Sequence, residues 1–399
     1  MESWKKNLFS LWTAEFLAAL GLSMILPFLP FYIRELGVLD AGEVKRWSGL
    51  VFGAPFLIAT FVGPLWGWMG DRYGRKAMLI RALAGYAGSS FFMAFATSVQ
   101  QLLILRLIQG GVAGFIAATL AIAATTTPQD KMGYAMGVLQ TSLTTGAVIG
   151  PFIGGLLADH IGYRHIFFVT AAFGFAAAFL VILLVKESIS SPAEKKSPGL
   201  ISNFRLVFTS APLITVFAAG MAVQTAVMAI QPVLSLFVER LWPEGKNLAT
   251  VAGGVFAITG LASLISAPYW GKKGDRIGYK KMLLITLLGT GLTCIPQALV
   301  NQVYQLFCLR FVYGLFVGGI LPALYTLTSL NVRAERRGGI MGITRSGLLI
   351  GNVVGPISGG FLSAFLGIRP LFIFMAVLLF LVYLWVRRVI KEPKPIEQK

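Results

Sequence analysis

The stretch HIFFVTAAFGFAAAFLVILLVK, residues 165–186, has no charged residue between its terminal His165 and Lys186. An α-helix of this length crosses a hydrocarbon core about 30 Å thick. The run is continuously apolar and does not alternate, which excludes a strand of a membrane β-barrel. Eleven similar runs occur along the 399-residue chain. We therefore predict twelve transmembrane helices, at residues 7–33, 47–69, 77–97, 101–124, 134–158, 165–186, 211–238, 250–271, 282–300, 302–328, 340–365 and 369–388.

The composition agrees with this prediction. The chain is 56 % hydrophobic and 13 % charged, about half the charged fraction of a soluble domain, and its mean hydropathy is +0.77. The connecting segments are too short to form a water-soluble domain. The first run, preceded by Lys5 and Lys6, could also be a signal peptide, but its length, the interruption by Glu15 and the absence of a small-residue cleavage site favour an uncleaved helix. The predicted fold class is an all-α membrane protein with two six-helix bundles.

The net charge of +18 would suggest a nucleic-acid partner in a soluble protein. When the N-terminus is taken as cytoplasmic, however, 24 Lys and Arg residues fall on that side of the membrane and 7 on the other. Three more, Arg106, Arg310 and Arg345, fall within predicted helices. This asymmetry is the positive-inside pattern. We therefore expect both termini in the cytoplasm, a multi-pass location in a bacterial cell membrane, lipid contacts and no nucleic-acid partner.

The two halves of the chain resemble each other. Trp66-Gly67 and the triplet at residues 70–72, GDR, recur 204 positions later at 270–271 and 274–276, and the Gly150-Pro151 pair recurs 205 positions later as Gly355-Pro356. Each half has six predicted helices, so both halves have the same orientation, as in transporters that bind substrate between parallel repeats. We predict bundles at residues 1–186 and 211–399, a cytoplasmic linker at 187–210 and a short cytoplasmic tail. Duplication in a channel or a receptor is the alternative interpretation.

The decapeptide GWMGDRYGRK, residues 67–76, occupies the connection between helices 2 and 3. Its glycines permit close approach or unusual backbone angles, and its carboxylate could accept N–H groups from the start of another helix. Such a cluster could latch a cytoplasmic gate, although the basic residues could also serve only as membrane anchors. The candidate gate residues are Gly67, Asp71, Arg72, Gly74, Arg75, Lys76 and, in the second copy, Asp275 and Arg276.

A second motif, GAVIGPFIGG at residues 146–155, places small residues four positions apart in helix 5. This spacing lets two helix backbones approach closely, and the proline removes one helical hydrogen bond and favours a kink. Its members are Gly146, Gly150, Pro151, Gly154 and Gly155. The echo of this motif at residues 351–360 indicates that helix packing alone can select it.

Charges inside the helices are candidates for function because burying them is costly. Glu15 is the one acidic residue within a predicted helix. Low dielectric favours the neutral form of a carboxylate, so Glu15 could exchange a proton for a cationic substrate. Pairing of Glu15 with a base at the membrane edge is the alternative, and the arginines could instead extend to an interface, as we expect for Arg345.

A binding cavity should be apolar and aromatic with a few polar points. We list as cavity candidates Met24, Phe28, Gln140, Gln224, Arg310, Tyr313, Tyr325 and Asn352. No phosphate-binding loop, nucleophile elbow or metal motif is found, and neither the histidines nor Cys294 and Cys308 form one. We therefore expect a protein that is not an enzyme, with a small-molecule substrate, no cofactor and no metal, acting as a monomer.

The decapeptide at residues 67–76 resembles the loop signature of the major facilitator superfamily, and the likeness extends over the whole chain. The chain is most similar to the drug:proton antiporter branch with twelve helices. The resemblance implies a cavity between two rocking bundles, lined mainly by helices 1, 4, 7 and 10 with help from 2, 5, 8 and 11. It also implies an exporter motif at residues 146–155 and a proton-coupling role for Arg106, in a stretch that resembles the helix 4 motif.

The resemblance thus implies proton-coupled efflux of hydrophobic or cationic drugs by alternating access, which is a cause of antibiotic resistance. Transport of a lipid, a glycolipid or a metabolite is the alternative within transport. A sensor that has kept the fold of a transporter is the alternative outside it.

Overall fold

The computed structural model describes residues 3–187, 200–243, 245–333 and 336–390, and all regular structure in these ranges is helical. The chain forms two compact units, Met1–Ala193 with Leu234–Ala257, and Glu194–Val233 with Ile258–Lys399. The helices before the second unit are α1 (Ser3–Met24), α2 (Leu29–Glu35), α3 (Ala41–Tyr73), α4 (Arg75–Met93), α5 (Val99–Gly111), α6 (Phe115–Thr126), α7 (Met132–Ile161) and α8 (Tyr163–Leu184).

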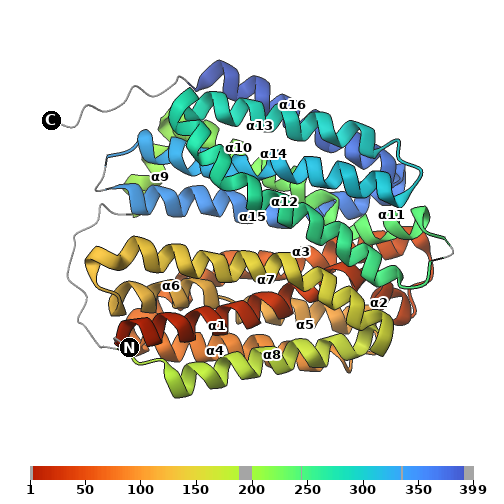
Figure 1. Cartoon of the computed structure of the whole chain (residues 1–399), viewed down its shortest axis with the longest axis horizontal. Helices are drawn as coiled ribbons and strands as arrows, with labels where there is room; N and C mark the ends of the chain where they lie inside the picture. Colours follow the sequence, from red (N-terminus) through yellow and green to blue (C-terminus); the bar gives the residue numbers. More distant parts are fainter. Residues whose placement is uncertain (1–2, 188–199, 244, 334–335, 391–399) are drawn as a thin grey trace. The chain divides into compact units, whose positions relative to one another are not determined.

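The remaining helices are α9 (Leu200–Thr209), α10 (Ala211–Ala229), α11 (Leu234–Leu241), α12 (Leu248–Ile277), α13 (Tyr279–Gln297), α14 (Val303–Leu330), α15 (Arg337–Leu366) and α16 (Ile368–Val389) (Figure 1). Helix α9 lies within the segment that we expected to be a linker. Helix α11 and the first ten residues of α12 pack with the first unit, although they follow the first helix of the second repeat in sequence.

Every predicted transmembrane run contains helix. Ten stretches of the described residues are long and apolar enough to span a membrane, whereas α4 and α13 fall short of that criterion. Three predicted runs are interrupted: residues 7–33 and 211–238 by short 3-10 turns around Pro27 and Pro232, and residues 101–124 between α5 and α6. The break between α5 and α6 ends at Gly114, the residue before α6, whose φ of +125° disfavours a side chain.

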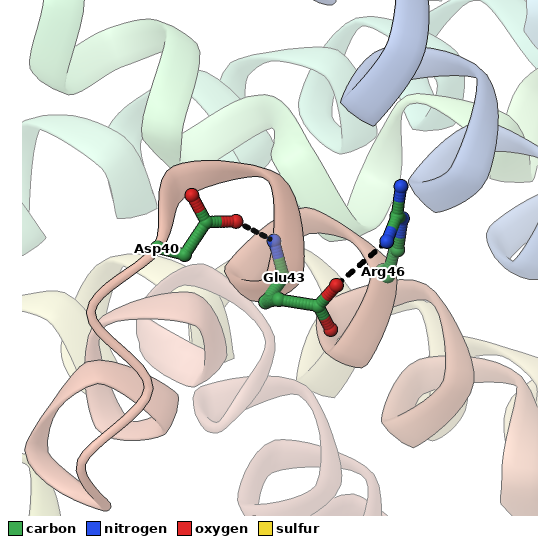
Figure 2. Close-up of polar contacts among 3 residues, drawn as sticks. All are labelled: Asp40, Glu43 and Arg46. Carbon is green, nitrogen blue, oxygen red and sulfur yellow. Dashed lines mark hydrogen bonds and ion pairs between the residues drawn. The ribbon is translucent and has the colours of Figure 1, made fainter.

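Helix ends are set by local chemistry. The carboxylate of Asp40 accepts the backbone N–H of Glu43 at 2.8 Å and caps the start of α3 (Figure 2). Glu43 in turn accepts a hydrogen bond from Arg46 Nη1 at 2.6 Å. Helices α3 and α4 are joined at Gly74, and α12 and α13 at its repeat mate Gly278, with φ values of +95° and +90°. A positive φ at these one-residue junctions explains glycine there.

The repeat seen in the sequence is also present in the contacts. Trp66 Nε1 donates to the carbonyl of Gly111 at 2.7 Å, and Trp270 Nε1 donates to that of Leu315 at 2.6 Å, both 204 positions later. The Arg164 and Arg369 guanidinium groups likewise donate to the carbonyls of Ala96 and Val300. Each of these arginines donates to a backbone carbonyl just after α4 or α13, which are equivalent helices. Their recurrence therefore has a structural explanation.

Helix α7 packs closely on α1 through the glycines at positions 146, 150 and 154. A side chain at any of them would collide with the backbone of α1, near Leu20 and Met24. The equivalent glycines of α15, at 351, 355 and 359, meet α10 near Thr225 and Ala229. The predicted packing face of the fifth helix is therefore confirmed in both units. Small residues suit such an interface because lipid supplies no hydrophobic force between helices.

This packing yields a stability prediction. Gly154→Val should place its side chain in the backbone of α1 and cost about 1–3 kcal/mol or more, whereas Gly137→Val on the same helix adds its Cβ at a position with no described atom within 4 Å. Thermal unfolding of the two variants in the same detergent measures the difference. Equal melting temperatures for both would contradict close packing of α1 on α7.

Candidate functional site

Glu15 is buried between α1 and α7, with 1 % of its surface exposed. Its Oε2 lies 2.9 Å from the hydroxyl of Ser142, and that hydroxyl also lies 2.6 Å from the carbonyl of Leu139. A hydroxyl has one proton and can donate to only one of these two acceptors. When Ser142 donates to the carbonyl, Glu15 must be protonated to complete the second hydrogen bond. An ionised Glu15 instead accepts the hydrogen bond that the Ser142 hydroxyl donates, so the pair has a distinct hydrogen-bond arrangement for each charge state.

The pair exists in only one repeat. The contacts of α1 with α7 recur in α10 with α15 at an offset of 205 residues. In the second repeat, Gly220 and Gly347 therefore occupy the positions equivalent to Glu15 and Ser142. The duplicated packing therefore does not need the carboxylate or the hydroxyl. Sequence reasoning identified Glu15 but missed Ser142, because a serine among threonines and glycines carries no distinguishing pattern.

Arg106 is also buried, with 2 % exposure, in α5. Its Nη1 donates to Gln109 Oε1 at 2.9 Å, and the Gln109 amide donates to Ser90 Oγ at 3.3 Å. Among the described residues no ion pair joins Arg106 to Glu15. The two predicted coupling residues therefore lie in the same unit, but each has its own hydrogen-bond partner.

Arg310, the repeat mate of Arg106, is 2 % exposed in α14. Within the described part of the chain, its Nε and Nη2 have no hydrogen-bond partner. The guanidinium carbon lies 5.3 Å from the ring centre of Tyr313 and 5.7 Å from that of Phe372, so aromatic rings partly stabilise its charge. Arg345 is exposed on α15, consistent with a side chain that extends to an interface.

The predicted cavity residues do not share one environment. Met24, Phe28, Arg310 and Tyr313 are buried inside their own units. Gln140 is exposed, and Tyr325 is half-buried. Gln224 Nε2 donates to Asn352 Oδ1 at 2.7 Å, joining α10 to α15. None of the eight borders the two hollows of about 410 and 460 Å³ that flank α13, whose walls are almost entirely apolar.

At the predicted cytoplasmic gate, a carboxylate that we did not predict caps α4. Glu187, just beyond α8, accepts the backbone N–H groups of Arg75 at 2.7 Å and Lys76 at 3.0 Å. Arg75 Nη1 donates to the carbonyl of Ala121, and Lys76 Nζ donates to that of Ile182. The side chain of Asp71 is outside the part that the structure describes. A capping carboxylate distant in sequence has no local signature, which explains why sequence reasoning missed Glu187.

The other gate candidates are mostly exposed. Arg72 lies over the rings of Trp68 and Tyr73, at 5.7 and 5.6 Å from their centres. A side chain at Gly67 would meet no atom within 4 Å, so close packing does not explain that glycine. In the second copy, Asp275 accepts a hydrogen bond from the Tyr279 hydroxyl at 2.6 Å, and Arg276 is exposed.

The motif at residues 146–155 contacts two helices. Its first three glycines face α1, whereas Gly155 meets the backbone of Ala249 at the start of α12. Pro151 lies within the continuous helix α7, and its carbonyl touches Gly253. The described residues contain no group of three or more His, Cys, Asp or Glu side chains that could hold a metal ion.

A family model described as Major Facilitator Superfamily matches residues 11–241 and 246–399. The chain belongs to the major facilitator superfamily. The multidrug resistance protein MdtG of Proteus mirabilis (strain HI4320) is 38 % identical over 386 residues, which cover 96 % of each chain. MdtG of Salmonella typhimurium is 38 % identical over 391 residues, 96 % of this chain and 95 % of that protein.

Solved structures agree in fold. A bacterial homologue of the human lysosomal transporter Spinster, inward-facing and unoccupied, gives a TM-score of 0.81 at 17 % identity over 99 % of both chains. The nucleoside transporter NupG also gives 0.81, at 14 % identity, over 98 % of this chain and 99 % of that one. This major facilitator superfamily member is therefore a multi-pass transporter of a small molecule and not an enzyme, as the sequence predicted.

The Glu187 cap gives a second stability prediction. Glu187→Ala removes the acceptor of two backbone N–H groups and should cost about 1 kcal/mol. Glu43→Ala is the matched control, because it removes only an exposed pair with Arg46 and leaves the backbone N–H on Asp40. Thermal unfolding in detergent compares them. A loss of stability at Glu43 as large as at Glu187 would contradict the capping role.

Proposed function

We propose that the chain is a proton-coupled exporter of hydrophobic or cationic small molecules. The observation that carries the proposal is the buried Glu15–Ser142 pair in one repeat alone. A carboxylate at 1 % exposure is expensive to keep ionised, and the packing around it does not require it. Its retention is explained if the residue exchanges its charge during the transport cycle.

The coupling scheme needs one carboxylate. Protonated Glu15 donates to Ser142 and has no unbalanced charge, so the site has no attraction for a cation. Ionised Glu15 needs a counter-charge in this low-dielectric environment, which a cationic substrate can supply. Proton and substrate therefore compete, and an inward proton gradient drives the substrate out. Arg106, with Gln109 and Ser90 as partners, would set the electrostatic field around this exchange.

Further elements of the proposal have separate support. The positive charges favour a cytoplasmic location for both termini in a bacterial cell, and the residues at 67–76 and 275–276 would form the cytoplasmic gate. The parallel repeats support alternating access by rocking of two bundles in a monomer. Gln140, Gln224, Tyr325 and Asn352 keep enough exposure to contact substrate. The name of the MdtG relatives, multidrug resistance protein, supports export.

Glu15→Gln tests the coupling. In proteoliposomes with an imposed pH gradient, the native protein should accumulate a cationic dye such as ethidium. The variant has no titratable group at this position, so gradient-driven accumulation should fall at least tenfold and its pH dependence should flatten. Glu43→Gln, which changes a partly exposed carboxylate on α3, should behave like the native protein.

The outcomes separate the alternatives. Unchanged pH dependence in Glu15→Gln would show that Glu15 is not the coupling residue. Movement of labelled lipids without movement of dyes would favour a lipid or glycolipid transporter. Absence of any flux, with folded protein, would favour a sensor.

A further inference from the structure

The start of α12 is capped by a side chain from α7. Asp159, in the last turn of α7, accepts the backbone N–H of Ala249 at 3.0 Å through Oδ1 and that of Thr250 at 2.7 Å through Oδ2. Oδ2 also accepts the Thr250 hydroxyl at 2.6 Å. Both carboxylate oxygens are thus used, and the contact joins residues 90 or 91 positions apart within the first unit.

The equivalent helix of the first repeat is capped differently. Helix α3 begins after Asp40, which caps its own helix through the N–H of Glu43 (Figure 2). Helix α12 follows Asn247, whose φ of +62° is unlike the extended backbone of Asp40. The repeat mate of Asp159 is Ala364, which has no carboxylate. The cap between two helices therefore occurs in one repeat only, and the duplicated fold does not require it.

The backbones of α7 and α12 approach closely below the cap. Gly155 meets the backbone of Ala249, and Gly253 meets the carbonyl of Pro151. At these two positions no side chain stands between the helices, so moving them apart there would not require a side chain to be unpacked. The hydrogen bonds of Asp159 to Ala249 and Thr250 thus add a directional polar interaction to this contact between α7 and α12. Arg34 of α2 and Glu239 of α11 form a separate ion pair at 2.6 Å that joins the same segments of the unit.

We propose that Asp159 is a gating residue that holds the start of α12 on α7 in one state of the transport cycle, and that this contact breaks and reforms in each cycle. The residue acts by positioning α12 and does not contact the substrate. The inference rests on the proposed transport cycle, but its test reads the position of the helices independently of transport.

The test uses the Arg34 and Glu239 positions as a reporter. Arg34→Cys and Glu239→Cys are introduced into the full chain with Cys294→Ala and Cys308→Ala, and a short bis-maleimide links them. Asp159→Asn should slow linking about five- to thirtyfold, the change that loss of a helix cap produces. Thr250→Val, which keeps the backbone N–H groups, should slow it less. Asp159→Glu should restore part of the rate.

A structural role in helix stability is separated by a second substitution. Asn247→Asp places a carboxylate on the same helix end and, combined with Asp159→Asn, should restore thermal stability without restoring the linking rate. Recovery of both would show that Asp159 only stabilises α12. An unchanged linking rate in Asp159→Asn and Thr250→Val would also overturn the proposal. Slower linking in a protein that moves no dye would support the gating contact and count against drug export alone.

Discussion

The close approach of α1 to α7 is the constraint on which the rest of the first unit depends. Within a bilayer, apolar burial gives no net attraction between helices, so contact depends on matched surfaces and short polar interactions. The glycines at 146, 150 and 154 bring the two backbones together, and Ser23 Oγ lies across the contact at 2.8 Å from the carbonyl oxygen of Gly146. That approach also places Glu15 beside Ser142, at a depth where the carboxylate is excluded from water.

The two repeats show which features belong to the scaffold. Glycine contacts between the first and fifth helices, the tryptophan hydrogen bonds and the closing arginines occur in both. The Glu15–Ser142 pair and the Gln224–Asn352 pair each occur once, at different levels of equivalent helix pairs. A duplicated fold thus serves as its own control: what both halves keep is explained by packing, and what one half has alone needs a separate explanation.

Sequence reasoning was most successful where the signal is periodic or repeated. Apolar length predicted runs that all contain helix, ten of them in stretches long and apolar enough to span a membrane, and small-residue spacing predicted the packing face of α7. It was weakest for single polar residues, because Ser142, Glu187 and Asp159 act on helices distant in sequence and have no motif of their own. The cavity candidates remain predictions for a related reason. Residue type does not give the rotation of a helix about its axis, and Met24 and Phe28 proved to face the interior of their own unit.

The placement of charge within the first unit follows from these energetics. Along the middle of α7, the contacts at its glycines are made with the backbones of α1 and α12, as small residues allow. Strong directional interactions lie at helix ends instead. Glu187 caps the start of α4 and Asp159 caps the start of α12, where backbone N–H groups without a partner inside the helix are stabilised most by a carboxylate. Glu15 is the exception, since it is buried away from any helix end. Among the described residues, Glu15 caps no helix and forms no ion pair with an arginine, and this isolation is what the proposed exchange of a proton would account for.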